Sequence, residues 1–299
     1  MKRGQPTAIL VGDEHLREDI PICRTDDFLS EQERKVLWLR GLQAKYGCPV
    51  LSSGDMFDRW KPPLSLVAMT LRCMADEYIT VPGNHDLPGH NINMLEKSGL
   101  AVLSAAKRVR VALEPIYTDQ FELYPFPWGS TLKPHSEPAK SLPCVAVAHV
   151  MTWVGDMPWP GCEDLEASKL LDHMKSYDLV LTGHNHKTFV VEKNGRLLVN
   201  PGSLMRTTAI QADHKPCVFL WYARTNEVVP VYVPINKGVI SRRHIDSKEE
   251  KDERMQAYVS SFNEKYKTTI SFDDNLEAFY RKNHVRQSVK DLIGESKGG

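Results

Sequence analysis

The sequence predicts an α/β fold in which one large domain is followed by a small C-terminal appendage. Short apolar runs of strand length alternate with helical patterns in the N-terminal third of the chain, which is the rhythm of βαβ units. Five apolar runs along the chain each end in Asp, Asn or His residues. The length of 299 residues, with 41% hydrophobic and 25% charged residues, suits a soluble domain plus an extension.

Three strands and two helices are predicted in the N-terminal third. The strands cover 8–11, 48–52 and 78–81, and the apolar run at 8–11 is continuous, as expected of a strand buried on both faces. A helix over 30–45 begins at Ser30, because Ser30 and Glu33 have the spacing of a capping box. A second helix begins at Pro62-Pro63 and ends near Asp76.

The middle of the chain is predicted to be rich in strands. Extended segments are expected at 109–113, 121–124, 144–148 and 179–181, with a helix over 163–174. Two hairpins follow. One turns at Asn194-Gly195, a strong signal for a type I′ turn, and the other turns near Thr225-Asn226.

The composition changes near Lys237, so we divide the chain into a catalytic domain, 1–236, and a charged, helical extension, 237–299. Asp273 is expected to cap one final helix. On that helix Lys282, Arg286 and Lys290 recur every four residues and form a single basic stripe. Such a stripe is either a solvated face or a docking surface for a partner or a phosphate backbone.

Charge and composition restrict the classes of function. The formal net charge is +0, so there is no overall basic excess of the kind that nucleic-acid binders show, although a local basic groove stays open. The six cysteines are scattered without a Cys-x-x-Cys pair, which does not favour a disulfide framework. No apolar stretch approaches the length of a membrane span, and the apolar run at 8–11 is too short for a signal segment. We therefore expect a cytoplasmic protein without membrane contact.

The polar residues at the five strand ends have the composition of a site for two metal ions. Asp13 and His15, and likewise His184 and His186, are two residues apart, so both members of each pair point to the same side of an extended chain. A carboxylate has two oxygens and can bridge two cations. Each segment alone has a plainer explanation, such as a turn or a core histidine, but together they predict a two-metal site. The segments are Asp13-Glu14-His15, Gly54-Asp55-Met56-Phe57-Asp58-Arg59, Gly83-Asn84-His85-Asp86, His149 and Gly183-His184-Asn185-His186.

These five segments resemble the motifs of the calcineurin-like metallophosphoesterases over residues 8–235. The resemblance implies a four-layer αββα sandwich. It also implies that one metal is held by Asp13, His15, Asp55 and His186, and a second by Asp55, Asn84, His149 and His184. His85 would be a catalytic residue that does not bind metal, and Asp86 or Asp58 would orient an imidazole. Arg59 would either cap structure or contact substrate.

The resemblance implies hydrolysis of a phosphate ester. Two divalent cations would activate water and clamp the phosphoryl oxygens, and His85 would donate a proton to the leaving oxygen. Mixed carboxylate, amide and imidazole ligands suit Mn²⁺, Fe²⁺ or Zn²⁺ better than Mg²⁺. The family subgroup favours Mn²⁺.

The choice of substrate rests on a finer resemblance. Gly54 to Asp58, Gly83 to Pro88 and Asn200-Pro201-Gly202-Ser203 look like the Mre11/SbcD branch of DNA repair nucleases. That branch implies a DNA exo- or endonuclease, an ATPase partner of the SbcC/Rad50 type that contacts the C-terminal region, and a homodimer as an open option. Arg206 would reach a substrate phosphate, and Trp60, Trp153 or Trp159 could stack a base or pack in the core.

Three alternatives stay open. A phosphodiesterase for small or cyclic nucleotides uses the same metal set but needs a closed, uncharged pocket, whereas a nuclease needs an open groove flanked by Lys and Arg. A protein phosphatase is disfavoured because Asp86 stands where that branch has Glu. A non-catalytic scaffold is disfavoured because all eight site positions carry competent residues.

Overall fold

The computed structural model describes residues 4–134, 142–243, 245–246, 252–256 and 272–295. The chain divides into two units, Met1–Arg242 and Arg243–Gly299, and each is described by itself. Within the described ranges, no helix is long and apolar enough to cross a membrane.

The first unit contains two six-stranded sheets. In the first sheet four parallel strands meet two antiparallel ones, because β1 pairs with β2 in parallel and with β11 in antiparallel orientation. The strands, in spatial order, are β12 (Glu227–Tyr232), β11 (Cys217–Tyr222), β1 (Ala8–Val11), β2 (Val50–Ser52), β3 (Tyr78–Thr80) and β4 (Arg110–Val111).

The second sheet is also mixed, with parallel strands β6, β7, β8 and β10 at its centre. Asn194 and Gly195 both have positive φ (53° and 72°) between β9 and β10, which confirms the predicted hairpin. The strands, in spatial order, are β5 (Ile116–Tyr117), β6 (Glu122–Phe126), β7 (Cys144–Ala148), β8 (Leu179–Thr182), β10 (Arg196–Asn200) and β9 (Phe189–Lys193).

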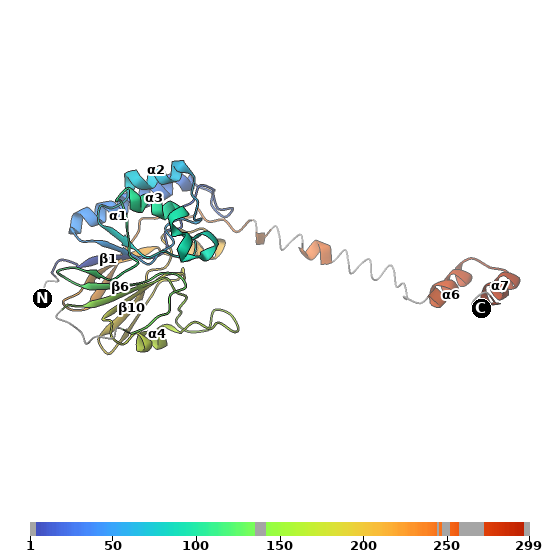
Figure 1. Cartoon of the computed structure of the whole chain (residues 1–299). Helices are drawn as coiled ribbons and strands as arrows, with labels where there is room; N and C mark the ends of the chain where they lie inside the picture. The colour runs from blue at the N-terminus through green and yellow to red at the C-terminus, as the bar shows by residue number, and fades with distance from the viewer. Residues whose placement is uncertain (1–3, 135–141, 244, 247–251, 257–271, 296–299) are drawn as a thin grey trace. The chain divides into compact units, whose positions relative to one another are not determined.

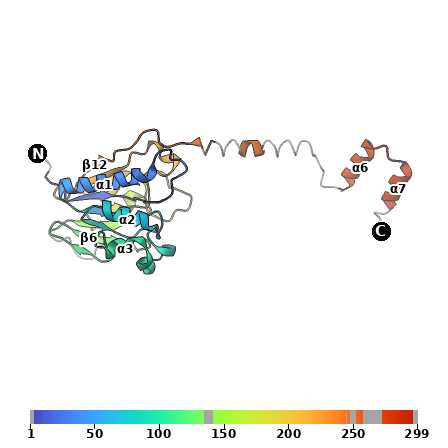
Figure 2. The same ribbon diagram turned by 90° about the horizontal axis from the view of Figure 1, so that it is seen from above.

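Helices cover the outer faces of the two sheets, which gives four layers. Figure 1 shows α1 (Phe28–Tyr46), α2 (Leu64–Cys73) and α3 (Gly99–Ala105) on one side and α4 (Ala167–His173) on the other. Figure 2 shows the first three helices side by side. Short 3₁₀ helices at Pro88–His90, Ile92–Lys97 and Ala209–Asp213 complete the unit. The predicted αββα sandwich is confirmed.

The alternation of side chains along β1 shows why this strand is apolar throughout. Ile9 and Val11 belong to the core under the first helix layer, whereas Ala8 and Leu10 belong to the core between the sheets. A third core lies between the second sheet and α4 and includes Val180. A strand between two apolar layers needs apolar residues at every position.

Two helices begin at positions other than those predicted. The cap of α1 is Asp27, whose carboxylate accepts from the Ser30 amide at 3.1 Å, so the helix starts before the predicted Ser30 capping box. Helix α4 starts at Ala167 and not at 163, because Glu166 forms a β-bridge with Trp153 and its carboxylate caps the first turn. In both cases a nearby acidic side chain satisfies the first amides of the helix.

Within the described range 272–295, two helices lie where one final helix was predicted. Helix α6 (Phe272–Lys282) carries Asp273 in its first turn, and α7 (Gln287–Glu295) follows. Lys282 ends α6, Arg286 lies between the helices and Lys290 is in α7, so the prediction of one basic stripe on one helix is wrong. Residues 244, 247–251 and 257–271 of the extension lie outside the described residues.

A buried lysine supports the backbone beneath the strand-end residues. Lys35 of α1 is 1% exposed, and its ammonium donates to the Leu204 carbonyl at 2.8 Å. The Leu204 amide in turn donates to the Asp13 carbonyl at 2.8 Å. Burial lowers the pKa of the Lys35 ammonium from 10.5 to about 7. Protonation of Lys35 in the folded protein therefore costs free energy.

We predict that Lys35 makes stability depend on pH. Between pH 7 and 10.5 the unfolded chain keeps a proton on Lys35 that the folded protein has released, so the free energy of unfolding rises with pH there, by at most about 1.4 kcal/mol per unit. Urea unfolding from pH 7 to about 9.5 measures the slope. It should flatten in Lys35→Met and persist in the exposed control Lys45→Met on the same helix. Equal slopes in both variants would contradict the prediction.

Candidate metal centre

The candidate ligands lie at the carboxyl ends of strands in both sheets. Asp13 follows β1, Asp55 follows β2 and Asn84 follows β3, while His149 follows β7 and His184 follows β8. These strands are parallel neighbours within their own sheets, so their ends meet at one edge, where ligands gather in α/β folds. This confirms the predicted placement of the motifs.

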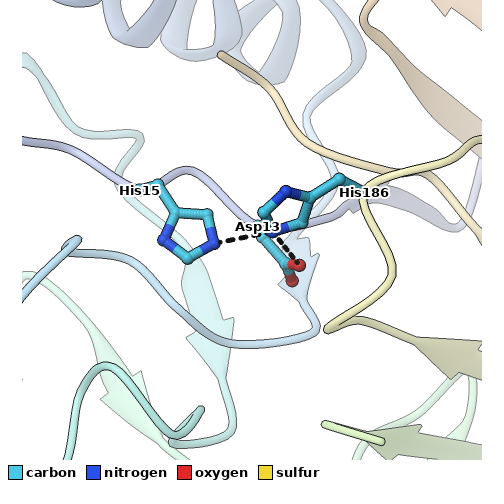
Figure 3. Close-up of side chains that lie close together, drawn as sticks. All are labelled: Asp13, His15 and His186. Carbon is cyan, nitrogen blue, oxygen red and sulfur yellow. Dashed lines mark hydrogen bonds and ion pairs between the residues drawn. The ribbon is translucent and has the colours of Figure 1, made fainter. Parts of the chain in front are cut away.

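The first cluster consists of Asp13, His15 and His186 (Figure 3). The His15 and His186 Nε2 atoms lie 3.0 Å apart, and His186 Nε2 lies 3.6 Å from Asp13 Oδ2. Asp13 and His15 are buried, and His186 is partly exposed. Three groups with lone pairs therefore converge on one point from two different sheets.

The second cluster consists of Asp55, His149 and His184, with the amide of Asn84 among them. The Asn84 Oδ1 atom lies 3.0 Å from His149 Nε2 and 2.9 Å from His184 Nδ1. His149 Nε2 lies 3.2 Å from Asp55 Oδ2. The other nitrogen of His149, Nδ1, donates to the Ser53 carbonyl at 2.7 Å, which fixes the ring and turns Nε2 toward the cluster.

Asp55 joins the two clusters. Its Oδ2 atom lies 3.6 Å from His15 Nε2 and 3.2 Å from His149 Nε2. Its Oδ1 atom accepts from the His85 amide at 2.8 Å, which orients the carboxylate. One carboxylate oxygen therefore faces imidazoles of both clusters, as the predicted bridging role requires.

The donor set fits divalent cations. Ligand atoms held about 2.1 Å from one cation lie roughly 3.0–3.4 Å from each other, and most separations within the two clusters are close to this range. In addition, Asp13 Oδ1 is buried and lacks a hydrogen-bond partner among the described residues. A buried carboxylate oxygen without a partner is costly, and a cation would satisfy it.

The electrostatics of the site keep most of the imidazoles neutral. Burial lowers the pKa of His15 to about 3 and that of His184 to about 4, so both offer lone pairs at neutral pH. His149 differs, because burial, the largest single influence, is outweighed by the combined effect of Asp55, Asp13 and the Ser53 carbonyl, which raises its pKa to about 9. Burial raises the pKa of Asp13. Positive charge between the carboxylates is thus favoured, and a cation would supply it.

Comparison with known proteins identifies the family. Residues 39–222 match the family model described as the calcineurin-like phosphoesterase superfamily domain. The chain belongs to this superfamily. The match includes Asp55, His85 and His186 but begins after Asp13 and His15, whose membership in the site follows from the geometry. The superfamily fold implies divalent metal ions, which agrees with the two clusters.

The solved structures to which the chain is similar are distant from it. An archaeal phosphodiesterase shares 15% identity at a TM-score of 0.41, covering 76% of this chain and 99% of that one. The protein TT1561 of Thermus thermophilus shares 11% identity at a TM-score of 0.46, covering 76% and 99%. A metallophosphoesterase from Sphaerobacter thermophilus shares 12% identity at a TM-score of 0.38, covering 77% and 89%. No curated protein matches the chain in sequence.

His85 lies beside the phosphoesterase site and is oriented by a backbone carbonyl. Its ring is 4.7 Å from that of His15, measured between centroids, and its Nδ1 donates to the Asp58 carbonyl oxygen at 2.7 Å. The Asp58 carboxylate instead contacts Arg17 at 3.3 Å. Asp86 or Asp58 was predicted to orient an imidazole. Asp58 does hold the His85 ring, but with its main-chain carbonyl and not with its carboxylate.

Asp86 orients backbone and not an imidazole. Its carboxylate accepts from the amides of Asp55 at 2.9 Å, Gly83 at 3.0 Å and Phe57 at 3.4 Å. Burial raises its pKa to about 7. These contacts tie the loop after β2 to the loop after β3, so Asp86 fixes the position of Asp55. The predicted contact with an imidazole is not present in these described loops.

The structure separates the two arginines predicted to contact substrate. Arg206 is 3% exposed and donates to the carbonyls of Ala212 at 3.1 Å and Asn236 at 2.7 Å, so the prediction that it reaches a substrate phosphate is wrong. Arg59 is exposed and lines a cavity next to the site. It has no side-chain hydrogen bond within the described ranges, which does not support the structural role considered for it.

An aromatic residue beside the metal centre, Trp128, is one that the sequence did not single out. The Trp128 ring lies 4.9 Å from His184 and 6.1 Å from His149, measured between centroids. Of the three tryptophans that were considered, Trp153 is buried at 7% exposure, whereas Trp60 and Trp159 are exposed. Trp128 follows β6, which pairs with β7. The sequence signal that could have indicated Trp128 is its position just after β6, the strand that neighbours the one leading to His149.

Gly54 makes room for His149, and we predict a large cost for Gly54→Ala. A Cβ atom there would lie 2.7 Å from His149 Nδ1, and the φ of Gly54 is +109°. The variant should bind metal at least about 10-fold more weakly, the cost of disturbing a residue that orients a ligand. Gly155→Ala is the control, since Gly155 has a φ of +84° but open space around it. Equal metal affinity in both variants, measured by calorimetry, would contradict the steric explanation.

Proposed function

We propose that this chain is a two-metal phosphodiesterase and that DNA is its substrate. The single observation that carries the proposal is that Asp55 faces both ligand clusters. His85 lies beside the clusters and is outside the one formed by Asp55, His149 and His184. One cation would be held by Asp13, His15, Asp55 and His186, and the other by Asp55, Asn84, His149 and His184. When bound, the cations would activate water and neutralise charge on the phosphoryl oxygens.

His85 would protonate the leaving group. The Asp58 carbonyl can only accept, so His85 Nδ1 carries a proton that the 2.7 Å hydrogen bond retains. In the imidazolium form Nε2 carries a second proton, which is not engaged by this hydrogen bond. That proton is the one to be donated to the departing oxygen when the P–O bond breaks.

Exposed cationic side chains beside the site support DNA over a small nucleotide. The cavity next to His85 is lined by three basic residues, Arg17, Arg59 and Lys61, and by three acidic ones. Arg17 pairs with two of the acidic residues, whereas Arg59 and Lys61 are exposed and unpaired among the described residues. A nuclease was expected to have an open groove flanked by Lys and Arg, and an enzyme for small cyclic esters a closed, uncharged pocket. Cationic side chains contact phosphates of any sequence. Mn²⁺ is the proposed metal, on the basis of the family subgroup.

The C-terminal helices are proposed to dock an ATPase partner subunit. Phe279 of α6 and Val289 and Leu292 of α7 are 56%, 45% and 70% exposed, and apolar residues at helical spacing suit binding in a partner groove. An ATPase of the SbcC/Rad50 type should co-purify with the full chain and be lost from the double variant Phe279→Asp, Leu292→Asp. Retention of the ATPase by that variant would exclude these helices as the docking segment.

A substrate comparison with Mn²⁺ tests the proposal. Single-stranded DNA, double-stranded DNA ends, cyclic dinucleotides and bis(p-nitrophenyl) phosphate are offered side by side to the full chain. DNA should be cut, and chelation of the metal should abolish the reaction. Hydrolysis of cyclic dinucleotides with intact DNA would favour the small-nucleotide enzyme. No metal binding and no turnover of any ester would favour a scaffold.

A further inference from the structure

A cavity of about 430 Å³ adjoins the His15–His85 side of the metal centre. Two of its lining residues are linked to site residues, because Leu16 follows His15 and the Asp58 carbonyl accepts from His85. The cavity therefore lies next to the segment around Asp58 that orients His85. Its volume falls in the range of small-molecule sites and exceeds the size of a single phosphate group.

The walls of this cavity are held by backbone hydrogen bonds. Leu16 forms a β-bridge with Phe57, and its carbonyl accepts from the Asp58 amide at 2.9 Å. The Gln32 side chain accepts from the Arg17 amide at 2.8 Å and donates to the Arg17 carbonyl at 2.9 Å. The two segments that carry the cavity are thus fixed to each other and to α1, so the cavity is preformed.

The lining of the cavity carries three basic and three acidic side chains, and two of the basic ones stand outside the ion pairs. Arg17 is neutralised by ion pairs with Asp19 and with Asp58, the latter at 3.3 Å. Arg59 and Lys61 are exposed, and neither has an ion-pair partner in the part of the chain that the structure describes. Glu18 is the lining carboxylate that remains outside the Arg17 network.

The amino end of α2 lies beside Arg59 and Lys61. Pro62 and Pro63 line the cavity, and α2 begins directly afterwards at Leu64. Its first turn has no acidic residue, and its N-cap residue makes no side-chain hydrogen bond. The amino end of a ten-residue helix therefore keeps its partial positive charge next to Arg59 and Lys61.

We infer that this cavity is a subsite for the leaving group of the substrate and that it recognises a second phosphate on that group. Leu16, Pro62, Pro63 and Leu66 offer apolar surface to a sugar and base, while Arg59 and Lys61 hold the phosphate. The preferred leaving group is a phosphorylated nucleotide unit. This inference rests on the proposed phosphodiesterase function, because it assigns a side to the leaving group through His85.

Dinucleotides with and without a terminal phosphate test the subsite. TpT, pTpT and TpTp are compared with Mn²⁺ and the full chain, so that the phosphate is added to either end. A terminal phosphate on the leaving nucleotide should raise kcat/KM by about 10–100-fold, mainly by lowering KM. This is the size of effect expected of a charge-assisted hydrogen bond. Most of this gain should be lost in Lys61→Ala and in Arg59→Ala, and Lys61→Glu should turn it into a loss.

Control variants and a second substrate separate the possible outcomes. Lys61→Arg should keep the gain, as should Lys169→Ala on the distant helix α4. Turnover of bis(p-nitrophenyl) phosphate, which lacks a second phosphate, reports the proposed function alone. If that ester is not cut, the proposed function fails. If it is cut but the wild type treats the three dinucleotides alike, or the gain persists in both alanine variants, the subsite is excluded.

Discussion

Turnover of the dinucleotide TpT, whose leaving group is an alkoxide, is expected to fall by about 10²–10⁴-fold in the His85→Ala variant, the usual contribution of a general acid. The metal content should stay at the wild-type level. The reason is geometric, because the ring nitrogen Nδ1 of His85 is engaged by the Asp58 carbonyl at 2.7 Å, while each ligand cluster has three or four other donors. Metal analysis of the purified variant and steady-state kinetics measure the two effects.

His173→Ala is the matched control for this variant. His173 ends helix α4 and donates to the Leu132 carbonyl at 3.0 Å, and it belongs to none of the ligand groups found in the described residues. It should keep both turnover and metal content. Loss of metal in His85→Ala would show that His85 is a ligand, as its place in a group with His15 and Asp55 also allows. Unchanged turnover would exclude His85 as the acid.

The Asp55→Asn variant is expected to lose metal from both sites. Asp55 Oδ2 lies 3.6 Å from His15 Nε2 and 3.2 Å from His149 Nε2. The substitution replaces the charged carboxylate with a neutral amide, so the two cations would lose the ligand that they share. Metal affinity should fall by more than about 10–100-fold, which is already the cost of losing a residue that only orients a ligand. Turnover should fall in parallel, because the reaction needs both cations.

The Asp13→Asn variant distinguishes a ligand of one metal ion from a ligand that both metal ions share. Asp13 contacts His186 at 3.6 Å but lies outside the Asp55, His149 and His184 group. This variant should keep one metal ion per chain, whereas Asp55→Asn should keep none at the same free metal concentration. Circular dichroism checks that both variants are folded. Two bound ions in Asp55→Asn would disprove the bridging role.

Regular elements near the site could be predicted because their signals are local. The apolar run at β1 and the Asn194-Gly195 turn are properties of a few neighbouring residues, and both are confirmed. The start of α1 was predicted too late in the chain, since Asp27 and Ser30 are both good caps and only the backbone shows which one accepts the amide. The break between α6 and α7 was missed because the apolar pattern continues through it.

The sequence by itself determined the kind of chemistry, because ligand types and their spacing at strand ends are local properties of the chain. The tertiary structure decided what depends on segments distant in sequence. It placed Arg206 in the interior on the Asn236 carbonyl and Trp128 against His184, and it gave the orientation of His85 to the main chain of Asp58. It also put Arg59 and Lys61 around a cavity beside His85. Such contacts follow from how the sheets pair and close on each other, which no single segment encodes.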